Sequence, residues 1–74
     1  MKNQYFYIEY QSGSRKYVKT NANKCEVIML TPFEQKIHTF NRPYPIHEEA
    51  FYNQISKVKY AAALAELEEV NIKA

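Results

Sequence analysis

The chain has 74 residues and a formal net charge of +2, with 46% hydrophobic and 24% charged residues. This composition is globular, since disordered chains combine low hydrophobicity with high net charge. A chain of this length is expected to form one domain, residues 1–74, and to bury only about 60% of the surface that its unfolded state exposes. Cys25 is the single cysteine, which excludes an internal disulfide.

No stretch of the sequence approaches the ~20 apolar residues that a transmembrane helix requires, so we expect no membrane partner. The first residues lack the uninterrupted apolar region and the small-residue cleavage site of a secretory signal. Together with the lone cysteine, this favours a reducing, cytoplasmic location.

The charged residues are divided unevenly along the chain. Residues 1–45 contain seven Lys or Arg and three Glu, a balance of +4, whereas residues 46–74 contain three Lys and five Glu, a balance of −2. Cations are densest between Arg15 and Lys24, where no acid occurs. We expect the acidic second half to offset part of the field of the basic first half.

Three strands are predicted in the first 30 residues. Residues 4–10 are mostly aromatic or β-branched, which is typical of a strand. A turn around Gly13, the only glycine, connects them to a second strand at residues 15–20, so the two runs form a β-hairpin. The apolar run at residues 26–30 predicts the most buried strand of the sheet.

Residues 31–41 fit two structures. Thr31, Pro32 and Glu34 match the N-cap, N1 and N3 positions of a helix. Residues 36–40 alternate as a strand does, and a helix here would have only about two turns. We favour a turn followed by a fourth strand. The prolines at 43 and 45 exclude a helix over residues 41–45.

From residue 46 to residue 70 the hydrophobic period is helical, and residues 71–74 are expected to fray. Ser56 could break this segment and cap a second helix. Apolar residues at three- and four-residue spacing share one face of the predicted helix. They are Phe51, Ile55, Val58, Ala62 and Ala65.

The predicted fold is therefore α+β: a small antiparallel sheet of three to four strands within residues 1–41, with one long C-terminal helix packed on one face. Side chains alternate between the faces of a strand. We expect the helix to cover the face that carries Phe6, Ile8 and Val18, with alternate residues of 27–30.

Reactive side chains are few. Cys25 would need His38 or His47 as a base to act as a nucleophile, but no cationic cluster or helix N-terminus adjoins it to lower its pKa. A small buried hydrophobe is the favoured role for this cysteine. His47 has no second histidine four residues on, as a zinc-protease helix requires, and Glu48 and Glu49 suit the first turn of a helix.

A single glycine cannot form a phosphate-binding loop, and one cysteine with two scattered histidines does not form a structural zinc site. The sequence therefore predicts no enzyme, no metal and no cofactor. A metal- or thiol-dependent enzyme that uses Cys25 and the histidines remains the hypothesis of a different class.

The first hairpin carries the candidate binding surface. Alternation places tyrosines and cations together on the face opposite the expected core. These partner-binding candidates are Tyr5, Tyr7, Arg15, Tyr17 and Lys19. Tyrosine and arginine are frequent hot-spot residues of protein interfaces, and rings beside cations also bind single-stranded nucleic acid. Cross-strand tyrosine pairs that only stabilise the sheet are the structural alternative.

We expect a small protein that modulates or inhibits a larger protein by stoichiometric contact. Its size and its Tyr, Asn, Lys and Ile content are typical of phage and mobile-element inhibitors of host transcription or defence enzymes. Single-stranded nucleic-acid binding through the same hairpin is the alternative function. A homodimer is a further option among its partners.

Overall fold

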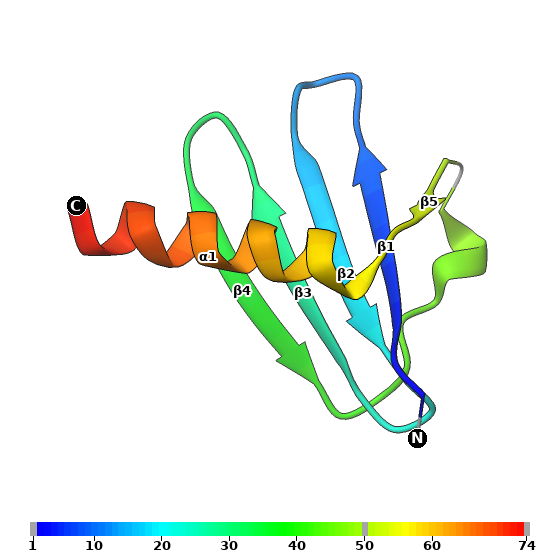
Figure 1. The fold of residues 1–74 in the computed structure, drawn as a ribbon. Helices are drawn as coiled ribbons and strands as arrows, with labels where there is room; N and C mark the ends of the chain where they lie inside the picture. Colours follow the sequence, from blue (N-terminus) through cyan, green and yellow to red (C-terminus); the bar gives the residue numbers. More distant parts are fainter. Residues whose placement is uncertain (1, 50, 74) are drawn as a thin grey trace.

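The structure, a computed structural model, describes residues 2–49 and 51–73, with side chains up to Glu66. An antiparallel sheet has the strand order β4-β3-β2-β1-β5, and helix α1 crosses one side of it (Figure 1). The strands are β1 (Gln4–Glu9), β2 (Arg15–Thr20), β3 (Cys25–Leu30), β4 (Gln35–Phe40) and β5 (Asn53–Gln54). The short 3-10 helix η1 spans Ile46–Glu48, and α1 spans Lys57–Lys73.

The first four strands lie where the sequence predicts strands, in a small α+β fold with β-hairpins. Gly13 has a φ of 90° in the first turn and donates its N–H to Tyr10 O at 3.0 Å. Thr31 Oγ1 accepts the N–H groups of Phe33 and Glu34 at 3.2 and 2.9 Å. The residues that resemble a helix start therefore form a turn, and β4 follows it as the favoured interpretation predicted.

The expectation of three to four strands is wrong because of β5, which makes the sheet five-stranded. Ile55, directly after β5, donates its N–H to Tyr5 O at 2.9 Å. β5 lies within the segment that the sequence assigned to the helix. A strand of two residues cannot show the alternation by which strands are recognised.

The α-helix begins at Lys57 and not at residue 46. Ser56 Oγ accepts the Lys59 N–H at 3.2 Å, so Ser56 caps this helix as the broken-helix alternative predicted. No α-helix forms in the described residues before it, where η1 and β5 stand instead. At its other end α1 continues to Lys73, into the segment expected to fray, and Ala74 lies outside the described residues.

The expectation that the helix covers the face of Phe6, Ile8 and Val18 is wrong. The helix covers the opposite face of the sheet, which we call the helix face. Tyr60 and Ala63 are buried on α1, with exposed fractions of 3% and 5%, and they lie over the side of the sheet that carries Tyr5, Tyr17 and Ile28. Most of the expected helix contacts are absent. Phe51 and Val58 are 81% and 77% exposed, Ala62 and Ala65 are exposed, and Ile55 is half-buried.

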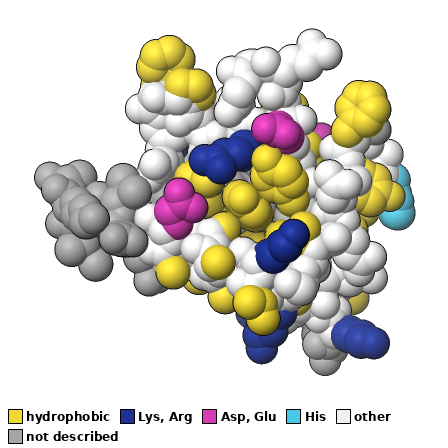
Figure 2. Space-filling model, turned by 45° about the horizontal axis from the view of Figure 1, so that its top comes forward, with side chains coloured by type: hydrophobic (Ala, Val, Ile, Leu, Met, Phe, Trp, Pro, Cys, Tyr) yellow, Lys and Arg dark blue, Asp and Glu magenta, His cyan; other side chains and the backbone are white. Residues whose placement is uncertain are grey.

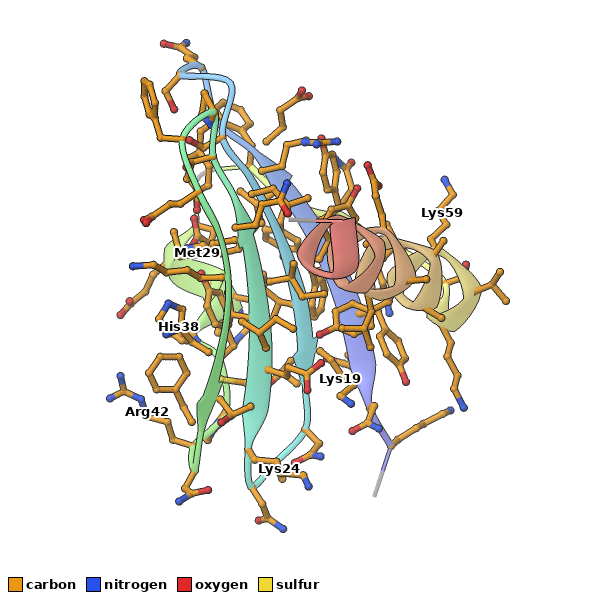
Figure 3. All side chains as sticks on the ribbon, turned by 90° about the vertical axis from the view of Figure 1, so that its left-hand side faces the viewer. Lys19, Lys24, Met29, His38, Arg42 and Lys59 are labelled. Atoms are coloured by element: carbon orange, nitrogen blue, oxygen red, sulfur yellow. The ribbon has the colours of Figure 1, made fainter. Side chains whose placement is uncertain are left out.

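The opposite side, the loop face, is covered by residues 43–49, which we call the covering loop. Its core combines strand residues with one residue of η1: Phe6, Ile8, Val18, Cys25, Val27 and Ile46. Thr20 Oγ1 accepts the Tyr44 N–H at 2.9 Å and fastens the loop to β2. Figure 3 shows the two sides of the sheet. Met29, His38 and Arg42 lie on the loop face, and Lys59 lies on α1, which packs on the helix face.

The observed burial predicts which helix residues stabilise the protein. We expect Tyr60→Ala to lower the free energy of unfolding by about 3 kcal/mol, because it removes a buried ring. Val58→Ala is the matched control and should change it by less than about 0.5 kcal/mol, since that side chain is exposed. Urea denaturation followed by circular dichroism measures both. A larger loss in the Val58 variant would contradict the observed helix orientation.

Candidate functional site

The five residues of the candidate surface share the helix face, as the predicted register requires. β1 and β2 pair Tyr5 with Lys19 and Tyr7 with Tyr17, and Arg15 stands opposite Glu9. The face is not open, however, because α1 crosses it, and all five side chains are half-buried. Their role in binding a partner stays a prediction. Tyr5 and Lys19 contact α1, whereas Tyr7, Tyr17 and Arg15 lie at or near a groove beside it.

Tyr5 and Lys19 contact the helix. The ring of Tyr5 lies 5.3 Å from the ring of Tyr60, and Lys19 Nζ lies 6.0 Å from the centre of that same ring. The Tyr60 hydroxyl donates to Glu26 Oε1 at 2.7 Å. Burial and this hydrogen bond raise the pKa of Tyr60, so the phenol is neutral. This first group therefore anchors α1 on the sheet.

Tyr7 and Tyr17 form the floor of a groove between the sheet and α1. Their ring centres are 4.9 Å apart with the planes inclined at 42°. We call this hollow, of about 350 Å³, the Tyr7–Tyr17 groove. It is lined by Tyr7, Tyr17, Ile55, Lys59, Ala62, Ala63 and Glu66. Figure 2 shows hydrophobic side chains gathered in the middle of one face, with cations and acids around them.

Charges of both signs surround the apolar floor. Lys59 and Glu66 line the groove from α1, and Arg15 acts on Tyr7 from β2. Burial and the nearby Glu9 raise the pKa of Tyr7, while Arg15 opposes the rise, so its hydroxyl remains a neutral donor. The groove can accept an apolar side chain between rings and helix and hydrogen-bond polar groups at its rim.

The helix contributes residues that the sequence did not indicate. Lys59 and Glu66 attracted no functional prediction, and Ala62 was assigned to the core, whereas it is exposed at the groove. The hairpin pattern contains no information on which helical residues lie above it. The burial of Tyr60 and Ala63, which fixes the rotation of α1, brings these three residues beside the hairpin.

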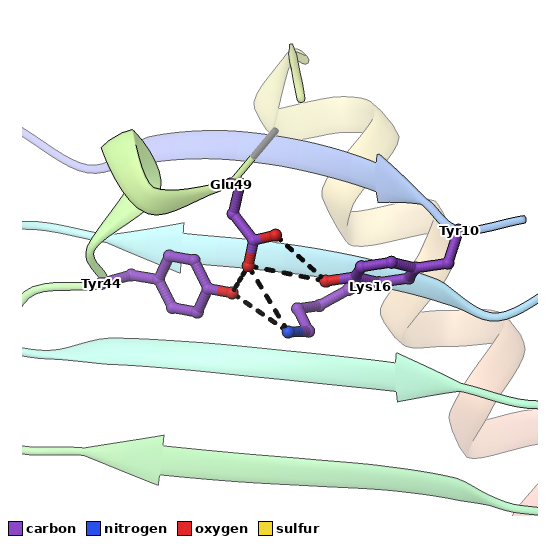
Figure 4. A network of polar contacts seen from close by, with 4 residues as sticks. All are labelled: Tyr10, Lys16, Tyr44 and Glu49. Carbon is purple, nitrogen blue, oxygen red and sulfur yellow. Dashed lines mark hydrogen bonds and ion pairs between the residues drawn. The ribbon is translucent and has the colours of Figure 1, made fainter. Parts of the chain in front are cut away.

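A second cluster of polar side chains lies between the covering loop and the sheet (Figure 4). Glu49 accepts hydrogen bonds from the hydroxyls of Tyr44 and Tyr10, the latter at 3.3 Å, and its Oε1 lies 3.7 Å from Lys16 Nζ. Lys16 donates to the Tyr44 hydroxyl at 3.1 Å and lies over both rings. We call these four residues the Glu49 clamp.

In the Glu49 clamp the lysine is charged and the tyrosine hydroxyl keeps its proton, as expected of groups that hold a structure together. Burial would lower the pKa of Lys16, but hydrogen bonds to Tyr44 and Tyr10 raise it, so the ammonium stays charged and is not a base. Burial and the bond to Glu49 raise the pKa of Tyr44 to about 12. The expectation that Glu49 lies in the first turn of a long helix is wrong, because Glu49 follows η1 and its carboxylate binds Lys16 of β2 and the two tyrosines instead.

Cys25 and His38, the nucleophile and base of the enzyme hypothesis, both border a hollow on the loop face. Cys25 is only 5% exposed, and burial raises the pKa of its thiol, against a smaller lowering by Arg42. The ring of His38 stacks at 6.3 Å on that of Phe40. Among residues 2–49 and 51–73, no three His, Cys, Asp or Glu side chains are grouped to hold a metal ion.

No protein-family model matches this chain, and no curated protein or solved structure matches it either. Within the described part of the chain, no helix is both long and apolar enough to cross a membrane.

The clamp predicts a loss of stability in alkali. An unfolded tyrosine ionises near pH 10, whereas Tyr44 in the folded chain has a pKa of about 12. Between these values the unfolded chain has released a proton that the folded chain retains, so the stability that is present below about pH 10 falls as pH rises. We expect Tyr44→Phe to make this decline shallower in urea denaturation at about pH 8 and about pH 11. Equal declines in both proteins would contradict the assignment.

Proposed function

We propose that the chain is a small non-enzymatic binding protein that modulates or inhibits a larger protein by stoichiometric contact. The Tyr7–Tyr17 groove is the observation that carries the proposal. It combines an apolar floor, two tyrosine rings and a rim with both signs of charge. Protein interfaces have this arrangement of an apolar centre within a polar rim, and tyrosine is among their commonest hot-spot residues.

The proposed partner offers an apolar side chain on a segment that carries both an acid and a base. Lys59 and Glu66 occupy different positions of α1, so a partner with a carboxylate near one and a cation near the other would be fixed in orientation. Two residues of the original candidate surface, Tyr7 and Tyr17, line this groove, and Arg15 acts on Tyr7 through its charge.

The absence of catalysis is part of the proposal. Its support is the protonation of the most reactive groups: a thiol with a raised pKa at Cys25 and an ammonium held charged at Lys16. A nucleophile requires the opposite shift in each case. Both groups are used in packing, Cys25 within the core of the loop face and Lys16 within the Glu49 clamp.

We further propose that the protein is a cytoplasmic inhibitor of the phage or mobile-element type, directed at a host transcription or defence enzyme. It is supported by the small size and by the Tyr, Asn, Lys and Ile content of the chain. Blocking an enzyme by contact needs only a surface, and a chain of this length can present one.

Single-stranded nucleic acid is the less favoured partner. Base stacking needs rings that are open to solvent on one side. The ring of Tyr5 already packs on Tyr60, Lys19 lies over that same ring, and Glu66 lines the groove where phosphates would approach.

A pair of neighbouring helix substitutions tests the groove. Ala61 and Ala62 are both exposed on α1, but only Ala62 lines the groove. We expect Ala62→Gln to weaken capture of a host protein by at least about tenfold, because the longer side chain fills the groove, a loss of about 1.4 kcal/mol. Ala61→Gln is the matched control, with the same small change in helix propensity, and should bind as the wild type does.

Affinity capture from host lysate, followed by titration of the purified prey, measures this difference. Equal binding by the two variants would contradict the groove as the site. A labelled oligonucleotide that binds the wild-type chain, weakens steeply with salt and is released by Ala62→Gln would favour nucleic acid instead.

A further inference from the structure

Strand β4 is an edge of the sheet that the described chain leaves open. The strand order places β3 on one side of it and no strand on the other, and all six of its residues are exposed. Two of them are large and apolar, Ile37 and Phe40, with exposed fractions of 42% and 40%. Edge strands are usually protected by short length, prolines or covering segments, because their free backbone groups pair readily with other strands.

The register identifies the backbone groups that point outward. Thr31 donates its N–H to Glu34 O at 2.9 Å, so these residues form a hydrogen-bonded pair at the hairpin turn. In antiparallel strands hydrogen-bonded and non-hydrogen-bonded pairs alternate. Leu30 with Gln35 is thus a non-hydrogen-bonded pair. The same holds for Ile28 with Ile37 and for Glu26 with Thr39. The N–H and C=O groups of Gln35, Ile37 and Thr39 point away from β3.

These three residues are spaced symmetrically about Ile37, and we propose that β4 pairs with β4 of a second copy of this chain, antiparallel and centred on Ile37. Ile37 then faces Ile37, and Gln35 faces Thr39 in both directions. Every outward N–H and C=O of the strand finds a partner, and two apolar side chains meet at the two-fold axis. This dimer uses an edge that is separate from the Tyr7–Tyr17 groove and does not depend on the function proposed for it.

The charges at the two ends of β4 support a second copy as the occupant. The Arg42 guanidinium lies over the ring of Phe40, 5.6 Å from its centre, on the loop face at one end of the strand. Glu34 stands at the other end, where it pairs with Lys36 at 3.4 Å. The symmetric register brings Glu34 of each copy opposite Phe40 of the other, and so next to a cation, twice in each dimer.

The helix fits the same arrangement. Figure 1 shows α1 crossing the sheet from β1 towards β4 and ending beyond that edge. A two-fold axis perpendicular to the sheet keeps both helices on one side, so each extends over the sheet of the other copy.

The molar mass in solution tests the dimer. Sedimentation velocity of the full chain over a concentration series should show a monomer–dimer equilibrium. We expect Ile37→Lys to weaken dimerisation at least tenfold, because two ammonium groups would then face each other. Ile37→Thr is the uncharged control and should weaken it less. Circular dichroism and melting curves verify that both variants fold, and a wild-type chain that is monomeric throughout would overturn the proposal.

Two further pairs of variants test the register, even if Ile37→Lys fails to fold. Glu34→Lys should weaken the dimer and Glu34→Lys with Arg42→Glu should restore it. Ile37→Cys should form an intermolecular disulfide under mild oxidation, because residues in a hydrogen-bonded pair have Cα atoms about 5.5 Å apart. Lys36→Cys is the matched control and should form no such disulfide, because in this register Lys36 of one copy faces His38 of the other copy. Equal cross-linking at both positions, or no rescue by the second charge, would overturn this pairing.

Discussion

Both faces of the sheet carry apolar side chains, and each face is covered by a different segment of the chain. The covering loop is held to the loop face by the Glu49 clamp and by Thr20, and α1 is held to the helix face by Tyr60. Both attachments lie over the first three strands. β4 lies outside both attachments and has a neighbouring strand along one edge only, and none of its side chains is buried.

The parts of this fold that a periodic pattern encodes could be predicted. Alternation and turn residues predicted β1 to β4 and their hairpins, and the serine at position 56 predicted the break before α1. Which face the helix covers could not be predicted. Alternation shows that Phe6 and Ile8 share a face and that Tyr5 and Tyr7 share the other, but not which cover each receives when both are apolar. Phe51 and Ile55 matched the helical spacing of Val58 although both precede the helix.

The candidate surface was predicted only in part for a related reason. Tyrosine serves equally in a buried contact and at a wet surface, since its ring is apolar and its hydroxyl is polar. Tyr5 is used in the first way, against Tyr60, while Tyr7 and Tyr17 line a groove. The helical side of that groove lies 42 to 59 residues away in sequence and comes together with the hairpin through the packing of Tyr60 and Ala63.

The two edges of the sheet are unequal, and this limits how far copies of the chain can assemble. β5, at the edge away from β4, is two residues long and lies between exposed Tyr52 and the start of α1, so it offers too little backbone to bind another strand. A sheet that can grow at one side only is complete when two copies meet. In the proposed dimer, the short fifth strand, which the sequence did not predict, leaves no long free edge for open-ended polymerisation and fibre formation.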